Sequence, residues 1–145
     1  MRIVRIMLVA GIVALLGASA VWASGAATLK VEKTKIGKVV ADSRGHTLYM
    51  FRADHGGKSA CYSSCATYWP PLTTAGKPKA GAGIEAALLG TIKRKDGKLQ
   101  VTYKKRPLYL YVGDSKRGQT TGEGSNNFGA KWYAVTPKGA VIDND

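Results

Sequence analysis

Apolar residues occur along the chain in short runs, and turn residues separate them. The runs lie at 29–31, 36–41, 47–51, 99–103, 108–112, 132–135 and 140–142. Glycine, proline, aspartate or asparagine lies between nearly all of them. Runs of this length with such separators are typical of β-strands. We therefore expect a mainly β protein after the first two dozen residues.

Specific turn residues indicate where these strands reverse. The dipeptide Asp96-Gly97 predicts a type I′ hairpin between 91–92 and 99–101. Residues 42–45 and 137–139 are predicted to turn two further hairpins. Only 84–89, and in part 59–68, suggest short helical turns. The segment 73–83 is rich in glycine, alanine, lysine and proline, which predicts a central loop.

The first residues have the pattern of a secretory signal peptide. Arg2 and Arg5 precede an apolar stretch at 6–16, and small residues follow before Ser24. We expect cleavage after residue 23 and a single domain at 24–145. The alternative is a retained membrane anchor, but the second half of the segment is small and polar, whereas a span needs about 20 predominantly apolar residues.

The chain is strongly basic. It has 22 Lys plus Arg against 9 Asp plus Glu, a net charge of +13, and loss of residues 1–23 would lower this to +11. Such a field favours anionic partners, which outside the cytoplasm include envelope polymers and lipid headgroups. Most of the cations are lysines, which favours diffuse attraction over specific recognition of phosphate groups, and we expect no specific nucleic-acid partner.

One motif occurs twice, sixty positions apart. Residues 48–54 and 108–114 both read L-Y-x-[FY]-x-x-D. A tryptophan preceded by alanine follows each copy, Trp69 in the first and Trp132 in the second. Two divergent copies of one β unit are the simplest account. We expect repeat 1 at about 36–74 and repeat 2 at about 90–142, as hairpins or meanders in a sandwich-like or barrel-like domain.

These motifs resemble a bacterial family of secreted repeats, often described as predicted lipoproteins with a Y-x-[FWY]-x-x-D motif. The resemblance rests on the two motifs, on the C-x3-C-A-x-x-W-P-P segment at 61–71, and on Trp132-Tyr133 followed by 137–139. It covers nearly all of the mature chain. It implies an extracytoplasmic repeat protein without an established activity. The chain lacks the lipidation cysteine of many members, so the resemblance does not imply a lipid anchor.

The spacing within the motif assigns side chains to faces. In a strand, residues two apart share a face, so Tyr49 should lie beside Phe51 and Tyr109 beside Tyr111. Asp54 and Asp114 follow the strands, where a carboxylate can accept backbone N–H groups of the next turn. We favour this structural role over a catalytic or cation-binding one for the two carboxylates.

Cys61 and Cys65 are four residues apart. In an exported protein this favours a disulfide, because that separation on a helical turn suits the required Cα distance. The alternative is a copper or zinc site made by the two thiolates with His46 or His55. The spacing matches neither a haem-attachment nor a thioredoxin-like motif.

The sequence leaves three functional hypotheses. The first, which we favour, is a non-enzymatic binding or structural module of the cell envelope that needs no cofactor and contacts anionic material. The second is an extracytoplasmic metal-binding or redox accessory protein that uses Cys61 and Cys65. The third is a hydrolase that uses Asp54 and Asp114. The oligomeric state is not determined by these patterns.

Overall fold

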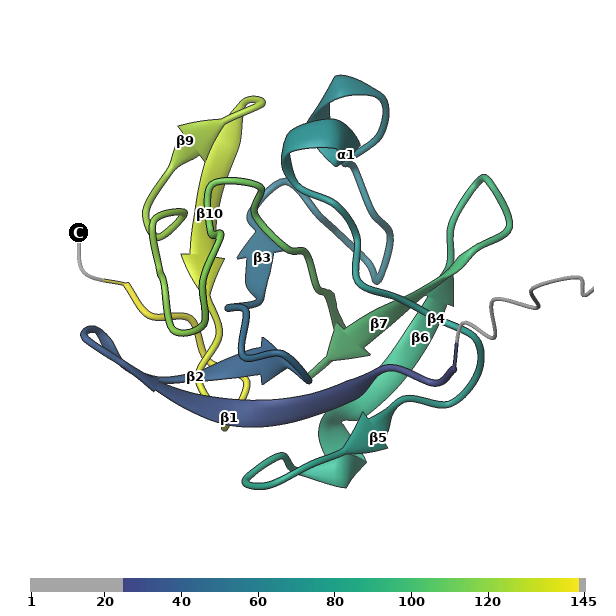
Figure 1. The fold of residues 1–145 in the computed structure, drawn as a ribbon. Coiled ribbons are helices and arrows are strands. Elements are labelled where there is room, and N and C mark those ends of the chain that lie inside the picture. Colours follow the sequence, from purple (N-terminus) through teal and green to yellow (C-terminus); the bar gives the residue numbers. More distant parts are fainter. Residues whose placement is uncertain (1–24, 144–145) are drawn as a thin grey trace, which may run out of the picture.

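Two long antiparallel hairpins open the two repeats. The computed structural model describes residues 25–143, so the predicted signal peptide at 1–23 lies outside the described residues. Strand β1 (Thr28–Thr34) pairs with β2 (Gly37–Asp42), and β6 (Leu89–Lys93) pairs with β7 (Leu99–Tyr103). The second hairpin repeats the first about sixty residues later. Figure 1 shows them as the lower and right-hand walls of the molecule.

The remaining strands are short and complete three small sheets. They are β3 (Tyr49–Phe51), β4 (Thr73–Thr74), β5 (Lys79–Ala80), β8 (Arg106–Pro107), β9 (Asn126–Asn127) and β10 (Ala130–Ala134). The sheet orders are β2-β1-β5, β3-β10-β9 and β4-β7-β6, and β8 also pairs with β7. The sheets do not close on one another. The prediction of a small, mainly β domain made of two repeats is confirmed.

Within residues 25–143, helical structure is confined to two short segments. Helix α1 (Ser64–Tyr68) forms in the segment 59–68, and the 3-10 turn η1 (Ala86–Leu88) forms in 84–89. Both are where the sequence predicted short helical turns. No helix within residues 25–143 has the length and apolar character needed to cross a membrane.

Three local predictions were wrong. The predicted loop 73–83 contains β4 and β5, because backbone groups there pair with β7 and β1. The run 108–112 forms no strand, since its N–H groups bond alternately to different neighbours, Leu108 to Val101 and Leu110 to Pro70.

The third wrong prediction concerns the position of the type I′ turn. Such a turn needs a positive φ at both central residues, and of Asp96 and Gly97 only Gly97 has one, 84°. The two-residue turn with two positive φ angles instead joins β7 to β8, at Lys104 (48°) and Lys105 (64°).

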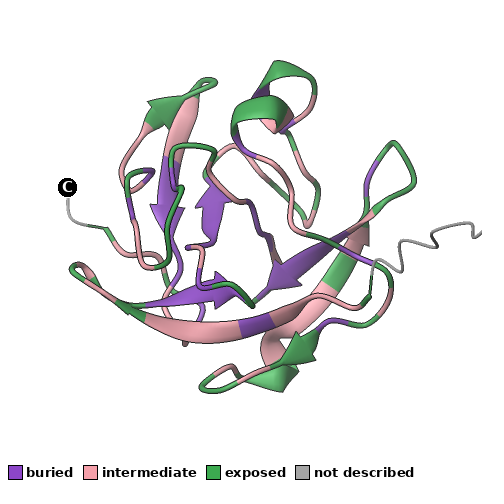
Figure 2. Ribbon diagram, in the orientation of Figure 1, coloured by how far each residue is buried: buried purple, intermediate pink, exposed green. Residues whose placement is uncertain are grey.

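The two faces of the motif segments bury different sets of side chains. Tyr49 and Phe51 lie in a mainly aromatic cluster, which we call the aromatic cluster, whereas Leu48 and Met50 lie in a mainly aliphatic one, which we call the aliphatic cluster. Tyr109 and Tyr111 likewise belong to the aromatic cluster, and their neighbours belong to the aliphatic one. Figure 2 shows the buried residues concentrated on β2, β3, β7 and β10, around the interior of the molecule.

The repeats exchange the segments at and directly after their tryptophans. In repeat 2, β10 pairs with β3 of repeat 1, with Trp132 opposite Phe51. In repeat 1, the segment 70–72 pairs with repeat 2, where Leu72 donates to Leu108 and accepts from Val101. Each repeat thus supplies strand pairing that the other needs, and the two form one interior.

Candidate functional site: the paired motif and a basic pocket

The two motif tyrosines meet at the junction of the repeats. The backbone N–H of Tyr49 donates to the carbonyl of Tyr109 at 2.8 Å, and the N–H of Tyr109 donates back at 2.9 Å. Both side chains are fully buried. The equivalent tyrosines of the two copies therefore pair with each other, so an approximate two-fold axis relates the two motif segments.

The tyrosine hydroxyls cross to the aspartate of the other copy. Tyr49 donates to Asp114 at 2.5 Å, and Tyr109 donates to Asp54 at 2.8 Å. Each carboxylate also accepts a backbone N–H from the turn that follows it, that of Thr121 and that of Ala60 respectively. The backbone contacts are those the sequence suggested. The crossed tyrosine contacts were not predicted, although the recurrence of tyrosine and aspartate in each copy was the available signal.

The protonation of these pairs follows from burial. Burial, followed by the neighbouring Asp114 carboxylate, raises the pKa of the Tyr49 hydroxyl far above its ordinary value. Burial, followed by the Asp54 charge, also raises the pKa of Tyr109. Burial raises the pKa of Asp54 too, although the Ala60 N–H and the Tyr109 hydroxyl act in the opposite direction. Both tyrosines therefore stay protonated and act as donors.

A column of stacked aromatic rings runs beside the crossed pairs. Trp69 and Trp132 stack at its centre, with ring centroids 4.0 Å apart and planes 6° apart. Phe51 stacks on the outer face of Trp132 at 4.0 Å, and Tyr111 stacks on that of Trp69 at 4.3 Å. Each tryptophan comes from one repeat and stacks on an aromatic residue of the other. The motif residues and the two tryptophans thus form the shared core of the domain.

Cys61 and Cys65 form a disulfide that joins the loop before α1 to that helix. Their Cα atoms are 5.2 Å apart, within the usual range, and both residues are buried in the aromatic cluster. The carbonyl of Cys65 accepts the N–H of Trp69 at 2.8 Å. The bridge therefore holds the segment that leads into the aromatic column.

A buried arginine fixes the same loop from the second repeat. Arg94 is 4% exposed and donates to the Cys61 carbonyl at 2.7 Å, to Ser59 Oγ and to Gln100 Oε1. Gln100, also buried, donates to the Leu108 carbonyl. The sequence did not indicate this buried role for Arg94 or Gln100. Arg94 lies between lysines that are exposed, and no pattern distinguishes it from them.

Replacing both cysteines by serine tests how much the disulfide contributes. The closed ring is short, so the loop-entropy estimate gives a loss of about 2 kcal/mol in the free energy of unfolding. Urea unfolding of the double variant under non-reducing conditions measures it, and the wild type with reductant is the matched comparison. A double variant as stable as the wild type would contradict this role.

The alternative metal site is not assembled in the structure. Cys61 and Cys65 are bonded to each other, and His46 lies against Asp42, with Nδ1 3.6 Å from the carboxylate. His55 instead lines a surface pocket. Within residues 25–143, no three His, Cys, Asp or Glu side chains gather in a way that would hold a metal ion. The alternative of a copper or zinc site made by the two thiolates with His46 or His55 is therefore wrong, because the disulfide leaves no thiolate to bind a metal.

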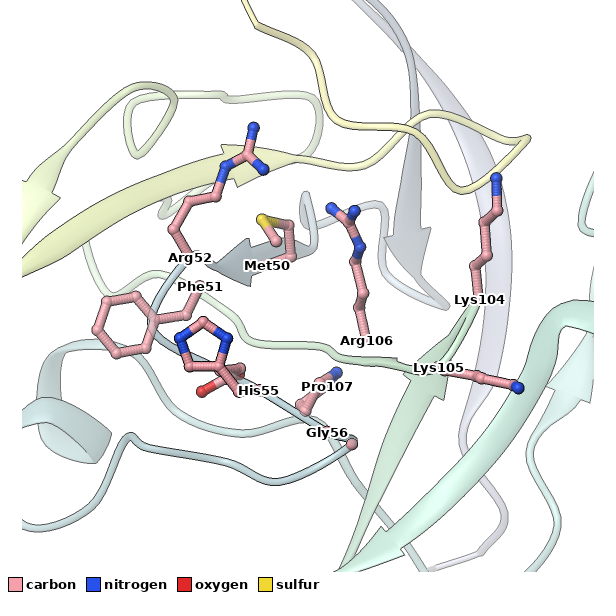
Figure 3. A pocket seen from close by; sticks show the side chains of 11 residues that line it. Met50, Phe51, Arg52, His55, Gly56, Lys104, Lys105, Arg106 and Pro107 are labelled. Carbon is pink, nitrogen blue, oxygen red and sulfur yellow. The ribbon is translucent and has the colours of Figure 1, made fainter.

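A basic pocket lies where β3 and the β7–β8 turn face each other. It has a volume of about 470 Å³ and is lined by Met50, Phe51, Arg52, Asp54, His55, Gly56, Gly57, Lys104, Lys105, Arg106 and Pro107. Figure 3 shows Arg52 and Arg106 on either side of Met50, with Lys104 beyond Arg106 and Lys105 pointing away. We call this the basic pocket. Sequence analysis did not identify it, because its two halves are about fifty residues apart.

Comparison with known families agrees with this two-repeat architecture. A family model described as a secreted repeat of unknown function matches residues 30–73 and 90–136. The chain belongs to this secreted-repeat family, as the motifs indicated. Comparisons with curated proteins and with solved structures returned no match.

Proposed function

We propose that this protein is an exported, non-enzymatic binding module of the cell envelope that holds an anionic polymer through its basic surface. Export would use residues 1–23 as a cleaved signal peptide, and the mature chain would begin at Ser24. The family description as secreted supports the extracellular setting. The observation that carries the proposal is the excess of cations, a net charge of +11 once residues 1–23 are removed.

The distribution of acidic partners supports this use of the cations. Glu32 already lies between Arg117, at 3.0 Å, and Lys30, at 3.5 Å. Asp42 is within 3.6 Å of both Arg44 and His46. Few acidic side chains are thus left to balance the remaining lysines and arginines, and the resulting positive field attracts polyanions.

The geometry of the motif residues argues against the hydrolase hypothesis. A catalytic pair of carboxylates must face one substrate, whereas Asp54 and Asp114 line different pockets, and each already accepts a tyrosine hydroxyl and a backbone N–H. The redox hypothesis also loses support, because thiol–disulfide exchange needs access to a sulfur, and Cys61 and Cys65 are 0% and 5% exposed. A binding role is the one that the surface charge favours.

We favour a polymer over a membrane as the partner. The basic pocket is concave, and a recess suits the anionic groups of a flexible chain better than a flat layer of headgroups. The binding test uses the chain from Ser24 with heparin, with long-chain polyphosphate and with phosphatidylglycerol vesicles.

The expected result is polymer binding at low salt that weakens steeply as salt rises. The physical reason is screening, since the Debye length falls from about 30 Å at 0.01 M to about 3 Å at 1 M ionic strength. Fluorescence anisotropy with labelled polymer measures the affinity. No binding of either polymer at low salt, or an affinity indifferent to salt, would refute the proposal, and binding confined to the vesicles would assign the membrane as the partner instead.

A further inference from the structure

Cations converge on the basic pocket from two parts of the chain. Arg52 directly follows β3, Lys104 and Lys105 come from the β7–β8 turn, and Arg106 comes from β8. Asp54 is the one acidic residue of its lining, and its oxygens bond to Tyr109 and to the Ala60 N–H. The pocket therefore has a strong excess of positive charge.

The turn that carries the lysines adopts a conformation that is costly for them. Lys104 and Lys105 both have left-handed backbone angles, which are unfavourable for residues other than glycine because Cβ approaches the following carbonyl oxygen. Asparagine and glycine are the usual residues of such a turn. Strained residues of this kind gather where a ligand is held. Here the conformation keeps Lys104 at the edge of the pocket beside Arg106 (Figure 3).

Arg106 has a donor that no group in residues 25–143 accepts. Its Nη1 atom is buried, and no hydrogen-bond partner for it is present among the described residues. The ion pairs of residues 25–143 involve neither Arg106 nor Lys104. A buried charged donor without an acceptor is costly. Because Arg106 lines the pocket, its guanidinium can turn this donor toward an anion there.

Arg52 completes the set from the opposite side. Its guanidinium lies over the ring of Tyr133, 5.2 Å from the centroid, and 3.9 Å from the carboxylate of Asp143. Both Arg52 and Asp143 are about half exposed in their side chains, so this ion pair is weak. Arg52 can therefore turn toward an anion in the pocket at little cost.

We propose that the basic pocket binds one phosphate group, held by Arg106, Arg52 and Lys104. Two guanidinium groups and an ammonium offer more donors than the two oxygens of a carboxylate can accept, whereas a phosphate has additional oxygens for them. The floor of the pocket is apolar, with Met50, Phe51 and Pro107 buried, which strengthens the charged contacts. This inference rests on the proposed function, because it names the group of the polymer that this site recognises.

The test compares matched charge deletions inside and outside the pocket. The pocket variant is Lys104→Gln with Arg106→Gln. The control is Lys33→Gln with Lys38→Gln, which removes the same charge from two exposed residues that face each other across β1 and β2. Calorimetric titrations use inorganic phosphate, with acetate as the carboxylate probe, at constant low ionic strength. Thermal unfolding verifies that each variant is folded.

We expect saturable binding of one phosphate per chain, tighter than that of acetate. The pocket variant should bind phosphate at least about tenfold more weakly, since each lost charge-assisted hydrogen bond contributes about 1.5–3 kcal/mol. The control should change phosphate affinity less than about twofold. If the double variant does not fold, Arg106→Lys replaces it as the pocket variant. It retains the charge but loses the forked donor, so it should still weaken phosphate binding.

Three results would overturn the phosphate site. They are the absence of saturable phosphate binding by the wild type, an equal loss in the pocket and control variants, and acetate binding as tight as phosphate. If the broader basic surface alone holds the polymer, salt-dependent binding of polyphosphate would still be observed in all three cases. The phosphate site can therefore be refuted while the proposed function stands.

To separate the sources of phosphate, the pocket variant is also tested with polyphosphate and with phosphatidylglycerol vesicles. A loss confined to the polymer supports the site as proposed, and a loss confined to the vesicles overturns it in favour of lipid headgroups.

Discussion

Truncation of Trp132 to alanine is expected to lower the free energy of unfolding by about 3–5 kcal/mol. The side chain is fully buried and stacks on both Phe51 and Trp69, with Tyr109 packed edge-on at 5.1 Å. Its indole N–H also donates to the Asn127 carbonyl. Removal would leave a cavity at the centre of the aromatic column. Urea unfolding followed by circular dichroism measures the loss.

The exposed aromatic Tyr68 provides the control for this substitution. Its side chain is 55% exposed, so Tyr68→Ala should change the stability by no more than about 0.5 kcal/mol. Trp132→Phe should fall between the two, because a smaller ring keeps part of the stack. A Trp132→Ala loss below about 1 kcal/mol would show that the column is not the main core of the domain.

Separation of the two repeats should abolish folding of each one. A cut between Gly83 and Ile84 leaves β3 without β10, because β10 comes from repeat 2. It also leaves Leu108 and Val101 without Leu72, which comes from repeat 1. Each fragment would then expose half of the aromatic cluster and unpaired strand edges. The core that remains in each fragment is too small to offset the cost of this exposure. We expect no cooperative thermal unfolding and no near-ultraviolet dichroism from either fragment alone.

Mixing the fragments is the matched comparison, since it restores every contact except the cut peptide bond. An equimolar mixture should regain the near-ultraviolet signal and show one cooperative transition whose midpoint rises with concentration. Either fragment folding alone as a monomer would contradict the exchange of segments. It would indicate that each repeat is an independent unit.

The sequence predicted the β class and the family because both depend on local patterns. Alternation along 48–51 and 108–111 places tyrosine and its aromatic neighbour on one face, and this holds whatever the partner strand is. Turn residues located most strand ends. The patterns failed for 108–112 and 73–83, where the partners of the backbone groups, and not the residues themselves, determine whether a strand forms.

Turn type is likewise determined by the partners of the flanking strands and not by the turn residues alone. Asp96-Gly97 is a strong local signal for a type I′ turn, yet the five-residue loop between β6 and β7 gives only Gly97 a positive φ. Lys104-Lys105 carries no such signal, yet the pairing of Tyr103 with Arg106 leaves only two residues to reverse the chain. Strand register therefore overrode the intrinsic preference of the turn residues.

The sequence by itself determined the two β repeats, the basic charge and the separation of cysteines that permits a disulfide, because these depend on residue type and short-range spacing. The tertiary structure alone decided that Tyr49 pairs with Asp114 and Tyr109 with Asp54, and that Arg52 and Arg106 share a pocket. Those contacts join residues about fifty or more positions apart. They follow from the way the repeats exchange segments around a common aromatic core, which depends on long-range packing that no local pattern encodes.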